Sequence, residues 1–408
     1  MASLLRATQP LRVPHFRLFI GANLFFTAAV QTQVVAQGWL VFHLTGSSLA
    51  LGVVTSMLSL SLLVCSPLAG VVADRFDRRR MTMLTWGGAA AVFVVVAVLI
   101  FTDHIRLWHL GAAALLNGVF LAFSIPARFA FLTQLVEEAE LLGAMALGGV
   151  IFYFSGIVFP LVGGALIDLV GIDVAYLLIA LFYLLAVGVI GLIPSYPMPP
   201  GEGRRRILGD LAAGIRFIAG HRALPWLLFL ALAAVVLGQS YSVLLPQFAA
   251  TTLGLPALGL GLLFSLIGLG ALMGNLLVAG LDSRRRLGRW LLLLGATAGA
   301  ALVGLALTRT LYPALGALFL LGLVGLPFFT LAEALVQLLS PPALRGRVSG
   351  LYMLSWAAMP LGSLPLAALA DAVGVAVPLA CAGGALLAIM VLVAWRRPAL
   401  LRLPSPPS

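Results

Sequence analysis

Charged residues are scarce in this chain of 408 residues, and lysine does not occur at all. Only 9% of the residues are charged, whereas an ordinary soluble domain carries about 25%. Hydrophobic residues make up 62% of the sequence, and the mean hydropathy is +1.14. This composition excludes a soluble globular protein, and we expect the lipid bilayer to surround most of the surface.

Cysteine is nearly absent as well. Cys65 and Cys381 both lie in apolar runs, so we expect neither a disulfide framework nor a metal site. No glycine-rich stretch ends in the Gly-Lys-Ser/Thr of a nucleotide-binding loop. The net charge of +11 comes from short arginine clusters between apolar runs, which does not point to nucleic acid. We therefore expect no cofactor, no metal ion and no nucleic acid partner.

Twelve apolar segments are long enough to cross a bilayer. They are 16–42, 49–72, 81–101, 107–124, 142–167, 174–193, 223–248, 258–281, 290–307, 311–335, 349–369 and 375–395. The sequence therefore predicts an all-α membrane protein with twelve transmembrane helices, and leaves no room for a sizeable soluble domain.

The polar stretch 194–222 divides these segments into two sets of six. We expect an N-terminal bundle (1–193), a cytoplasmic linker (194–222) and a C-terminal bundle with a short cytoplasmic tail (223–408). Within the linker, residues 207–218 place apolar side chains at helical spacing, which predicts an amphipathic surface helix.

The arginines support this topology, because cytoplasmic loops of membrane proteins carry most of the positive charge. If the N-terminus is cytoplasmic, 22 of the 24 arginines fall in cytoplasmic segments. Arg128 is counted among them, in the loop after residue 124, and only Arg106 and Arg309 fall outside. We expect a multi-pass protein of a bacterial inner membrane, monomeric, with both termini in the cytoplasm.

Two pairs of short sequences relate the halves to each other. Residues 132–141 match 335–344, and the stretch 74–80 (DRFDRRR) is echoed by 282–286 (DSRRR). Transporter folds are often built from such internal repeats.

The stretch 70–80 (GVVADRFDRRR) resembles the signature loop of the major facilitator superfamily, with Asp77 in place of the usual glycine. Its DRFDRRR form is similar to the enterobactin exporter branch, also described as transmembrane secretion effectors. Residues 39–47, 126–128 and 344–352 carry further similarities. The resemblance implies two six-helix bundles that rock around a central site, and thus secondary transport of a small molecule by alternating access.

The signature loop also implies a conformational latch. An acid followed by fixed arginines can form an ion-pair network where helices of the two halves meet, and the acid can face a helix N-terminus. The residues assigned to this latch are Asp74, Arg75, Arg78 and Arg79. The alternative is that these arginines only orient the protein in the membrane.

The segment 156–164 (GIVFPLVGG) resembles the exporter-associated motif of the superfamily, with Phe159 in place of its second glycine. Its characteristic residues are Gly156, Pro160, Gly163 and Gly164. Small residues allow helix backbones to approach closely, and proline permits a bend. General close packing explains these residues equally well.

Most polar side chains inside the predicted spans are uncharged. The candidates for lining a substrate cavity are Gln33, Gln37, Asn117, Gln239, Tyr241, Asn275, Tyr352 and Ser355. A cavity lined by amides, hydroxyls and aromatic rings suits an amphipathic or hydrophobic molecule better than one with several charges. Hydrogen bonds between helices are the alternative role for these side chains.

Glu333 is the only acid well inside a predicted span, and we assign it as a candidate for coupling transport to protons. An interfacial position, paired with Arg345 or Arg347, is an equally good interpretation. Val30 and Val34 stand where related exporters often carry an acid and an arginine, so the resemblance does not imply coupling at those two positions.

The function favoured by these features is secondary-active, proton-coupled export of a small amphipathic molecule such as a drug, siderophore or metabolite. Import of a small nutrient is the alternative within transport. A non-transporting membrane sensor and a membrane enzyme are alternatives of another class, and no constellation of catalytic residues in the sequence supports an enzyme.

Overall fold

The computed structural model describes residues 9–73, 76–196, 207–280, 286–342 and 344–403. Within these ranges all regular secondary structure is helical. Twelve of the helices are long and apolar enough to cross a membrane. The prediction of an all-α protein with twelve spans is therefore confirmed.

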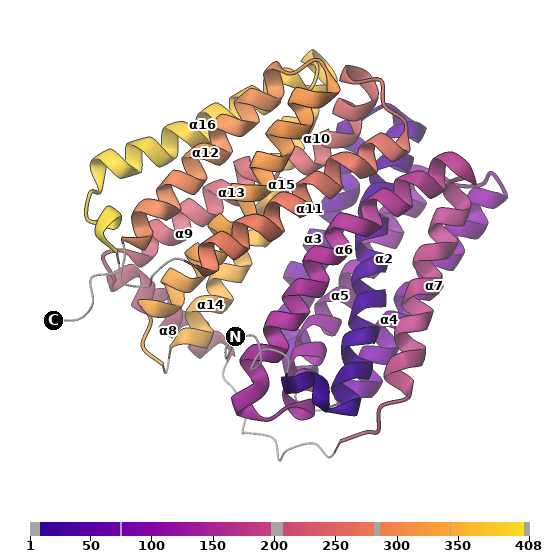
Figure 1. The fold of residues 1–408 in the computed structure, drawn as a ribbon, viewed down its shortest axis with the longest axis horizontal. Helices are drawn as coiled ribbons and strands as arrows, with labels where there is room; N and C mark the ends of the chain where they lie inside the picture. Colours follow the sequence, from indigo (N-terminus) through magenta and orange to yellow (C-terminus); the bar gives the residue numbers. More distant parts are fainter. Residues whose placement is uncertain (1–8, 74–75, 197–206, 281–285, 343, 404–408) are drawn as a thin grey trace. The chain divides into compact units, whose positions relative to one another are not determined.

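The helices are labelled in Figure 1. Ten of the twelve spans are single helices, namely α2 (Pro14–Thr45), α3 (Ser48–Ala73), α4 (Arg78–Phe101), α5 (Leu107–Leu135), α6 (Leu141–Leu169), α7 (Ile172–Gly191), α11 (Ala257–Ala279), α12 (Leu287–Leu307), α13 (Leu311–Leu338) and α16 (Ala376–Arg396). The shorter elements outside the spans are η1 (Gln9–Arg12), α8 (Ile207–Gly220) and η6 (Leu400–Arg402). The fifth span begins with the short 3₁₀ element η2 (Glu138–Glu140), directly before α6.

The seventh and eleventh spans are interrupted helices. The seventh consists of α9 (Leu224–Ala233), η3 (Ala234–Gly238), α10 (Tyr241–Gln247) and η4 (Phe248–Thr252), where η3 and η4 are π-helical. The eleventh consists of α14 (Arg345–Leu354), the 3₁₀ segment η5 (Ser355–Ala358) and α15 (Met359–Val373). Proline lies within α10 and at the start of α15, and its missing N–H weakens regular α-helical bonding there.

The chain divides into two compact units. Unit 1 comprises 1–46, 54–203 and 255–265, and unit 2 comprises 47–53, 204–254 and 266–408. The division follows the two predicted bundles except at two helix starts. The first residues of α3 belong to unit 2, and the first residues of α11 belong to unit 1.

Aromatic side chains form the core of unit 1. The Phe26 ring stacks on Trp86 with 4.9 Å between ring centroids, and Tyr183 meets Phe26 edge-on at 5.9 Å. The indole Nε1 of Trp86 donates a hydrogen bond of 2.8 Å to Ser124 Oγ. Such aromatic pairs contribute about 0.5–1.5 kcal/mol each beyond the area that they bury.

Glycine contacts bring α12 and α16 of unit 2 together. A Cβ atom on Gly299 would lie 2.7 Å from the carbonyl oxygen of Gly383, and one on Gly383 would lie 2.6 Å from the carbonyl oxygen of Gly299. Helices in lipid gain little from the hydrophobic effect, so close backbone approach through small residues stabilises their association.

The linker helix predicted at 207–218 is present as α8 and belongs to unit 2. Its Arg216 side chain is exposed and its Ile218 side chain is buried, as an amphipathic helix requires. At Gly214 the helix approaches α14 so closely that a Cβ atom would lie 3.0 Å from Leu351 Cδ1.

The fourth span differs from the prediction in its length. The apolar run was expected to end at residue 124, with Arg128 in the following loop. Instead, α5 continues through Pro126 to Leu135, which places Arg128 on a helix. Leu132 and Leu135 are buried in this extension, so packing against neighbouring helices outweighs the local decline in hydropathy.

Candidate functional site

Unit 1 contains a cavity of about 360 Å³ between α2, α5 and α6. This volume falls in the range of roughly 300–1,000 Å³ that is typical of small-molecule sites. The lining residues are Phe19, Ile20, Asn23, Thr27, Ile125, Arg128, Phe129, Leu132, Ala144, Met145, Gly148, Gly149, Phe152 and Tyr153. Apolar and aromatic side chains predominate, and Arg128 is the only charged residue among them.

The guanidinium of Arg128 is held by two neighbours on α2. Its Nη1 donates a hydrogen bond of 2.8 Å to Asn23 Oδ1, and its central carbon lies 4.3 Å from the ring centroid of Phe26. Its Nε is buried and has no hydrogen-bond acceptor. Among the described residues, no carboxylate acts on the charge of Arg128, and the ionisable group beside it is the phenol of Tyr183. Arg128 is thus a partly buried cation whose charge the described residues do not neutralise.

Three of the candidate cavity residues form a chain of amides in unit 1. Gln33 Nε2 donates to Gln37 Oε1 over 3.1 Å, and Asn117 Nδ2 donates to Gln33 Oε1 over 3.3 Å. Gln33 and Asn117 are buried. The structure therefore brings these predicted residues together, in a network that joins α2 to α5 and lies apart from the residues lining the cavity.

The glycines of the exporter-like motif lie where α6 approaches other helices most closely. A Cβ atom on Gly156 would lie 2.6 Å from Gln31 Nε2, and one on Gly163 would lie 3.0 Å from Thr32 Cγ2. One on Gly164 would lie 2.9 Å from the Cα atom of Leu258. Close backbone contact with the start of α11 thus explains glycine at position 164, whereas Gly156 and Gly163 lie nearest to side-chain atoms of α2.

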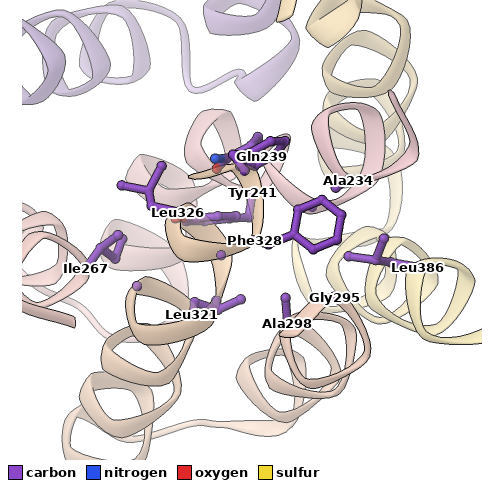
Figure 2. A pocket seen from close by; sticks show the side chains of 14 residues that line it. Ala234, Gln239, Tyr241, Ile267, Gly295, Ala298, Leu321, Leu326, Phe328 and Leu386 are labelled. Carbon is purple, nitrogen blue, oxygen red and sulfur yellow. The ribbon is translucent and has the colours of Figure 1, made fainter. Parts of the chain in front are cut away.

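Figure 2 shows side chains that line the pocket of unit 2. The volume of this pocket is about 20 Å³, which is much smaller than the cavity of unit 1 and gives space for roughly one water molecule. Aliphatic and aromatic side chains such as Leu326, Phe328 and Leu386 surround it, and Gln239 and Tyr241 supply polar groups. Two of the predicted cavity residues therefore do line a pocket, but this pocket is too small for an organic substrate.

The other candidates of unit 2 form hydrogen bonds with neighbouring residues. Asn275 accepts a hydrogen bond of 2.7 Å from Thr330 and donates to the carbonyl oxygen of Ala271. The remaining bonds in this group are Tyr352 Oη to Phe329 O at 2.8 Å, Ser355 Oγ to Tyr352 O at 2.7 Å, and Gln337 Nε2 to Glu333 Oε1 at 3.3 Å. Glu333 lies on α13 and is partly buried.

Two of the four latch residues, Asp74 and Arg75, lie outside the described residues. Arg78 Nη1 donates to the carbonyl oxygen of Ala130 over 3.0 Å. Arg79 Nη2 donates to the carbonyl oxygen of Gly191 over 2.6 Å, at the end of α7. Both arginines thus bind carbonyl oxygens within unit 1, and the predicted latch remains a prediction.

Asp168 and Asp371 are two carboxylates that sequence reasoning did not single out. Each accepts hydrogen bonds from the first backbone amides of a helix. In unit 1, Asp168 Oδ1 accepts from Ala257 N at 3.0 Å, and Oδ2 accepts from Leu258 N at 2.7 Å. We call such a carboxylate bound to a helix start a closure, because it holds the end of one helix against the beginning of another.

The closure in unit 2 has the same form. Asp371 Oδ1 accepts from Ser48 N at 2.7 Å, and Oδ2 accepts from Leu49 N at 3.1 Å and from Ser47 Oγ at 2.5 Å. A carboxylate at a helix N-terminus satisfies otherwise unpaired N–H groups and interacts favourably with the helix dipole.

A repeat in the sequence marks both closures. Asp168-Leu-Val-Gly171 and Asp371-Ala-Val-Gly374 each place a glycine three residues after the acid. Gly171 has φ +119° and Gly374 has φ +85°, a conformation that is strained for other residues. This shared pattern was the signal that could have identified the two acids.

Comparisons with known proteins agree with this architecture. The family described as transmembrane secretion effector matches residues 6–403. The enterobactin exporter EntS of Shigella flexneri is 27% identical over 349 residues, which are 83% of this chain and 80% of that protein. The corresponding exporter of Escherichia coli O1:K1 / APEC is 26% identical over 349 residues, covering 83% and 81%.

Solved structures of transporters share the fold. A bacterial homolog of the human lysosomal transporter Spinster, in an inward-facing and unoccupied conformation, matches with a TM-score of 0.73 and 13% identity over 97% of both chains. The nucleoside transporter NupG matches with a TM-score of 0.74 and 13% identity over 95% of this chain and 99% of its own. The chain therefore belongs to the transmembrane secretion effector family of the major facilitator superfamily, and it is a transporter and not an enzyme.

Proposed function

We propose that this protein exports a small amphipathic molecule from the cytoplasm by alternating access and uses the proton gradient as its energy source. The observation that carries the proposal is the matched pair of closures at Asp168 and Asp371. Each joins a helix of one predicted half to the beginning of a helix of the other half. The Arg asymmetry of the sequence would place both on the outer side of the membrane.

The strength of the closures suits a gate that must open in every cycle. Both carboxylates are exposed, and an exposed carboxylate at a helix N-terminus stabilises by about 0.3–1 kcal/mol. Two such contacts give roughly 0.6–2 kcal/mol, which shifts a two-state equilibrium by about 3- to 30-fold. A closure of this size favours one conformation but can be broken by thermal motion.

The direction of transport is supported by the relatives. Proteins 26–27% identical over most of this chain are named enterobactin exporters, and Gly164 of the exporter-like motif lies against the start of α11. Whether the substrate is a siderophore, a drug or another metabolite is a separate question, because small changes in a cavity alter specificity within one fold.

The direction of transport can be tested by comparing the metabolites of a deletion strain with those of the same strain complemented with the gene. Untargeted metabolomics of cells and medium should find at least one compound that accumulates in the deletion cells and falls in their medium. A compound that instead falls in the cells and remains in the medium would identify an importer.

Glu333 is the proposed coupling residue, because it is a carboxylate within a span and a partner of Gln337. In proteoliposomes loaded with the exported compound, Glu333→Gln should abolish transport driven by an imposed pH gradient and retain exchange of substrate. Gln337→Glu serves as a control for charge changes at the same helix face. If Glu333→Gln transports at the wild-type rate under the imposed pH gradient, this residue has no part in the coupling mechanism.

A further inference from the structure

We propose that the cavity of unit 1 binds the anionic group of the transported molecule and that Arg128 is its anchor; this inference rests on the export function proposed above. The expected ligand is an amphipathic anion, with a carboxylate or similar oxyanion on an apolar or aromatic body. This proposal adds a cation to the sequence-based expectation of a cavity lined by amides, hydroxyls and aromatic rings.

The charge of Arg128 is the first argument. A guanidinium carries five N–H donors and stays protonated at physiological pH. Within the described ranges, its hydrogen-bond acceptor is Asn23 Oδ1, its Nε has none, and no carboxylate balances its charge. A charge removed from water is unfavourable unless it is paired. A bound anion would supply both the missing charge and the missing acceptors.

The geometry of the cation also selects the ligand. Phe26 supports one face of the guanidinium at 4.3 Å, and Asn23 fixes Nη1 at 2.8 Å. These contacts hold the planar group in one orientation before a ligand arrives, and a planar guanidinium matches the two oxygens of a carboxylate. Because little side-chain freedom remains to be lost, binding an oxyanion here is favourable.

The apolar walls provide for the rest of the molecule. Phe129 and Phe152 are 52% and 45% exposed although they line the cavity, and Ile125 and Met145 are each 47% exposed. Burying the part of this surface that faces water in the cavity is favourable by about 25 cal/mol for each Å². A ligand with an aromatic or aliphatic body would cover these side chains while its oxyanion reaches Arg128.

Arg128 has a competing structural role, because its contacts with Asn23 and Phe26 also tie α5 to α2. The two roles predict different effects of a carboxylate placed next to Arg128. Asn23→Asp places a carboxylate where the amide oxygen now accepts from Nη1, so the cation becomes paired inside the protein. A structural tie would be kept or strengthened by this substitution, whereas a binding site for external anions would be occupied.

Isothermal titration calorimetry on the purified protein in a neutral detergent tests the site, with 1-naphthoate as the anionic probe and 1-naphthylmethanol as its neutral counterpart. Wild type should bind 1-naphthoate at least about 10-fold more tightly than the alcohol, because an oxyanion bound to arginine forms charge-assisted hydrogen bonds. Arg128→Met and Asn23→Asp should both lose this preference, and Arg128→Lys should retain part of it. Arg216→Met, at an exposed arginine of α8, should bind like wild type.

Folding is checked separately from binding by the melting temperature of each variant. Asn23→Asp should melt at or above the wild-type temperature, so that a lost preference in this variant cannot result from unfolding. Equal affinity of wild type for the two naphthyl probes, or unchanged preference in a folded Asn23→Asp, would overturn the proposal.

Two further measurements distinguish a transported anion from a lipid headgroup and from failure of the export function. Phosphatidylglycerol added to the micelles should not displace 1-naphthoate; displacement without any transport of naphthoate would assign the site to lipid and overturn the substrate assignment. In proteoliposomes with an imposed pH gradient, transport of naphthoate that Asn23→Asp abolishes would support the inference. Selective binding by Arg128 in a protein that exports nothing under any gradient would contradict the export function and support the anion site.

Discussion

Unit 1 and unit 2 share their closures but differ in their cavities. Asp168 and Asp371 hold the starts of α11 and α3 with nearly the same hydrogen bonds, and each is followed by a glycine of positive φ. The cavities, by contrast, measure about 360 Å³ and about 20 Å³. The repeat has therefore kept the contacts at the helix ends and has lost similarity in the interior.

The difference extends to charge. Arg128 lies against the cavity of unit 1, whereas Glu333 of unit 2 lies on α13, outside the residues that line the pocket there. Ionisable residues within membrane spans are energetically unfavourable, and those that occur usually have a function. Under the two proposals above, the units would divide the work, with a cation for the ligand in unit 1 and a carboxylate for coupling in unit 2.

The largest expected difference between the units is the loss of stability when a glycine beside each closure is replaced by alanine. A Cβ atom on Gly164 of unit 1 would lie 2.4 Å from the carbonyl oxygen of Ala257 on α11, whereas one on Gly52 of unit 2 would lie 3.4 Å from Leu364 Cδ2. Gly164→Ala should therefore destabilise the protein by about 1–3 kcal/mol through overpacking. Gly52→Ala should be neutral or stabilising by up to about 1 kcal/mol, because alanine favours helix.

Thermal unfolding in detergent would measure this contrast. Gly149→Ala is a matched control on α6, because nothing lies within 4 Å of its added Cβ. Similar losses in melting temperature for Gly164→Ala and Gly52→Ala would show that the two helix crossings are equally tight in solution.

Neutralising the closures tests whether they are equivalent. Asp168→Asn and Asp371→Asn should each weaken a closure by about 0.3–1 kcal/mol, and the double variant should lose the sum of the two. Hydrogen exchange should rise at Ala257 and Leu258 in the first variant and at Ser48 and Leu49 in the second. If one single variant slows transport as much as the double variant does, only that closure limits the cycle.

The two units also differ in how the end of α7 and the start of α12 are hydrogen-bonded, and Arg79 makes these bonds in unit 1. In unit 1 its guanidinium binds the carbonyl oxygens of Ile190 and Gly191, whereas in unit 2 the N–H of Gly288 binds the carbonyl oxygen of Leu403. Arg79→Gln should lower the free energy of unfolding by about 1 kcal/mol, and Arg80→Gln, at an exposed side chain, should change it little. Slower transport at unchanged stability would favour the latch role for Arg79.

Asp77 should produce the smallest effect, through pH. Burial opposes its ionisation, but hydrogen bonds from Ser195 and the Arg80 amide, together with the charges of Arg80 and Arg79, hold its pKa below 3.8. A carboxylate with a lowered pKa stabilises the fold above the unfolded value, and this contribution disappears as pH falls through the folded value. Between pH 5 and pH 3, roughly, the melting temperature of wild type should fall slightly more than that of Asp77→Asn. Parallel curves would show that this contribution is negligible.

The number of spans and the linker helix could be predicted from sequence because both depend on local properties. Bilayer thickness fixes the length of an apolar run, and helical spacing reveals one buried face. Helix ends were less predictable, since α5 continues through Pro126 where hydropathy falls. That error placed Arg128 in a loop and removed it from the candidates for the cavity.

Contacts between distant residues limited the prediction of the site. Gln33 and Asn117 can be recognised in the sequence as polar side chains inside spans, but only the structure shows that they bond to each other. Asp168 was passed over because it follows the last apolar residue of its span, where an acid is unremarkable. Its partner amides are about ninety positions away in sequence, and periodicity carries no information about such pairs.

The two π-helical segments of the seventh span have a consequence for any experiment that scans this helix residue by residue. A π-turn contains more residues than the 3.6 of an α-turn, so the face to which each side chain points advances differently across Ala234–Gly238 and Phe248–Thr252. A helical wheel drawn from Leu224 would therefore place Gln239 and Thr251 on the wrong faces. The helical periodicity of solvent accessibility along this span should therefore shift at each π-helical segment. The residues before and after each segment need to be analysed with separate helical wheels.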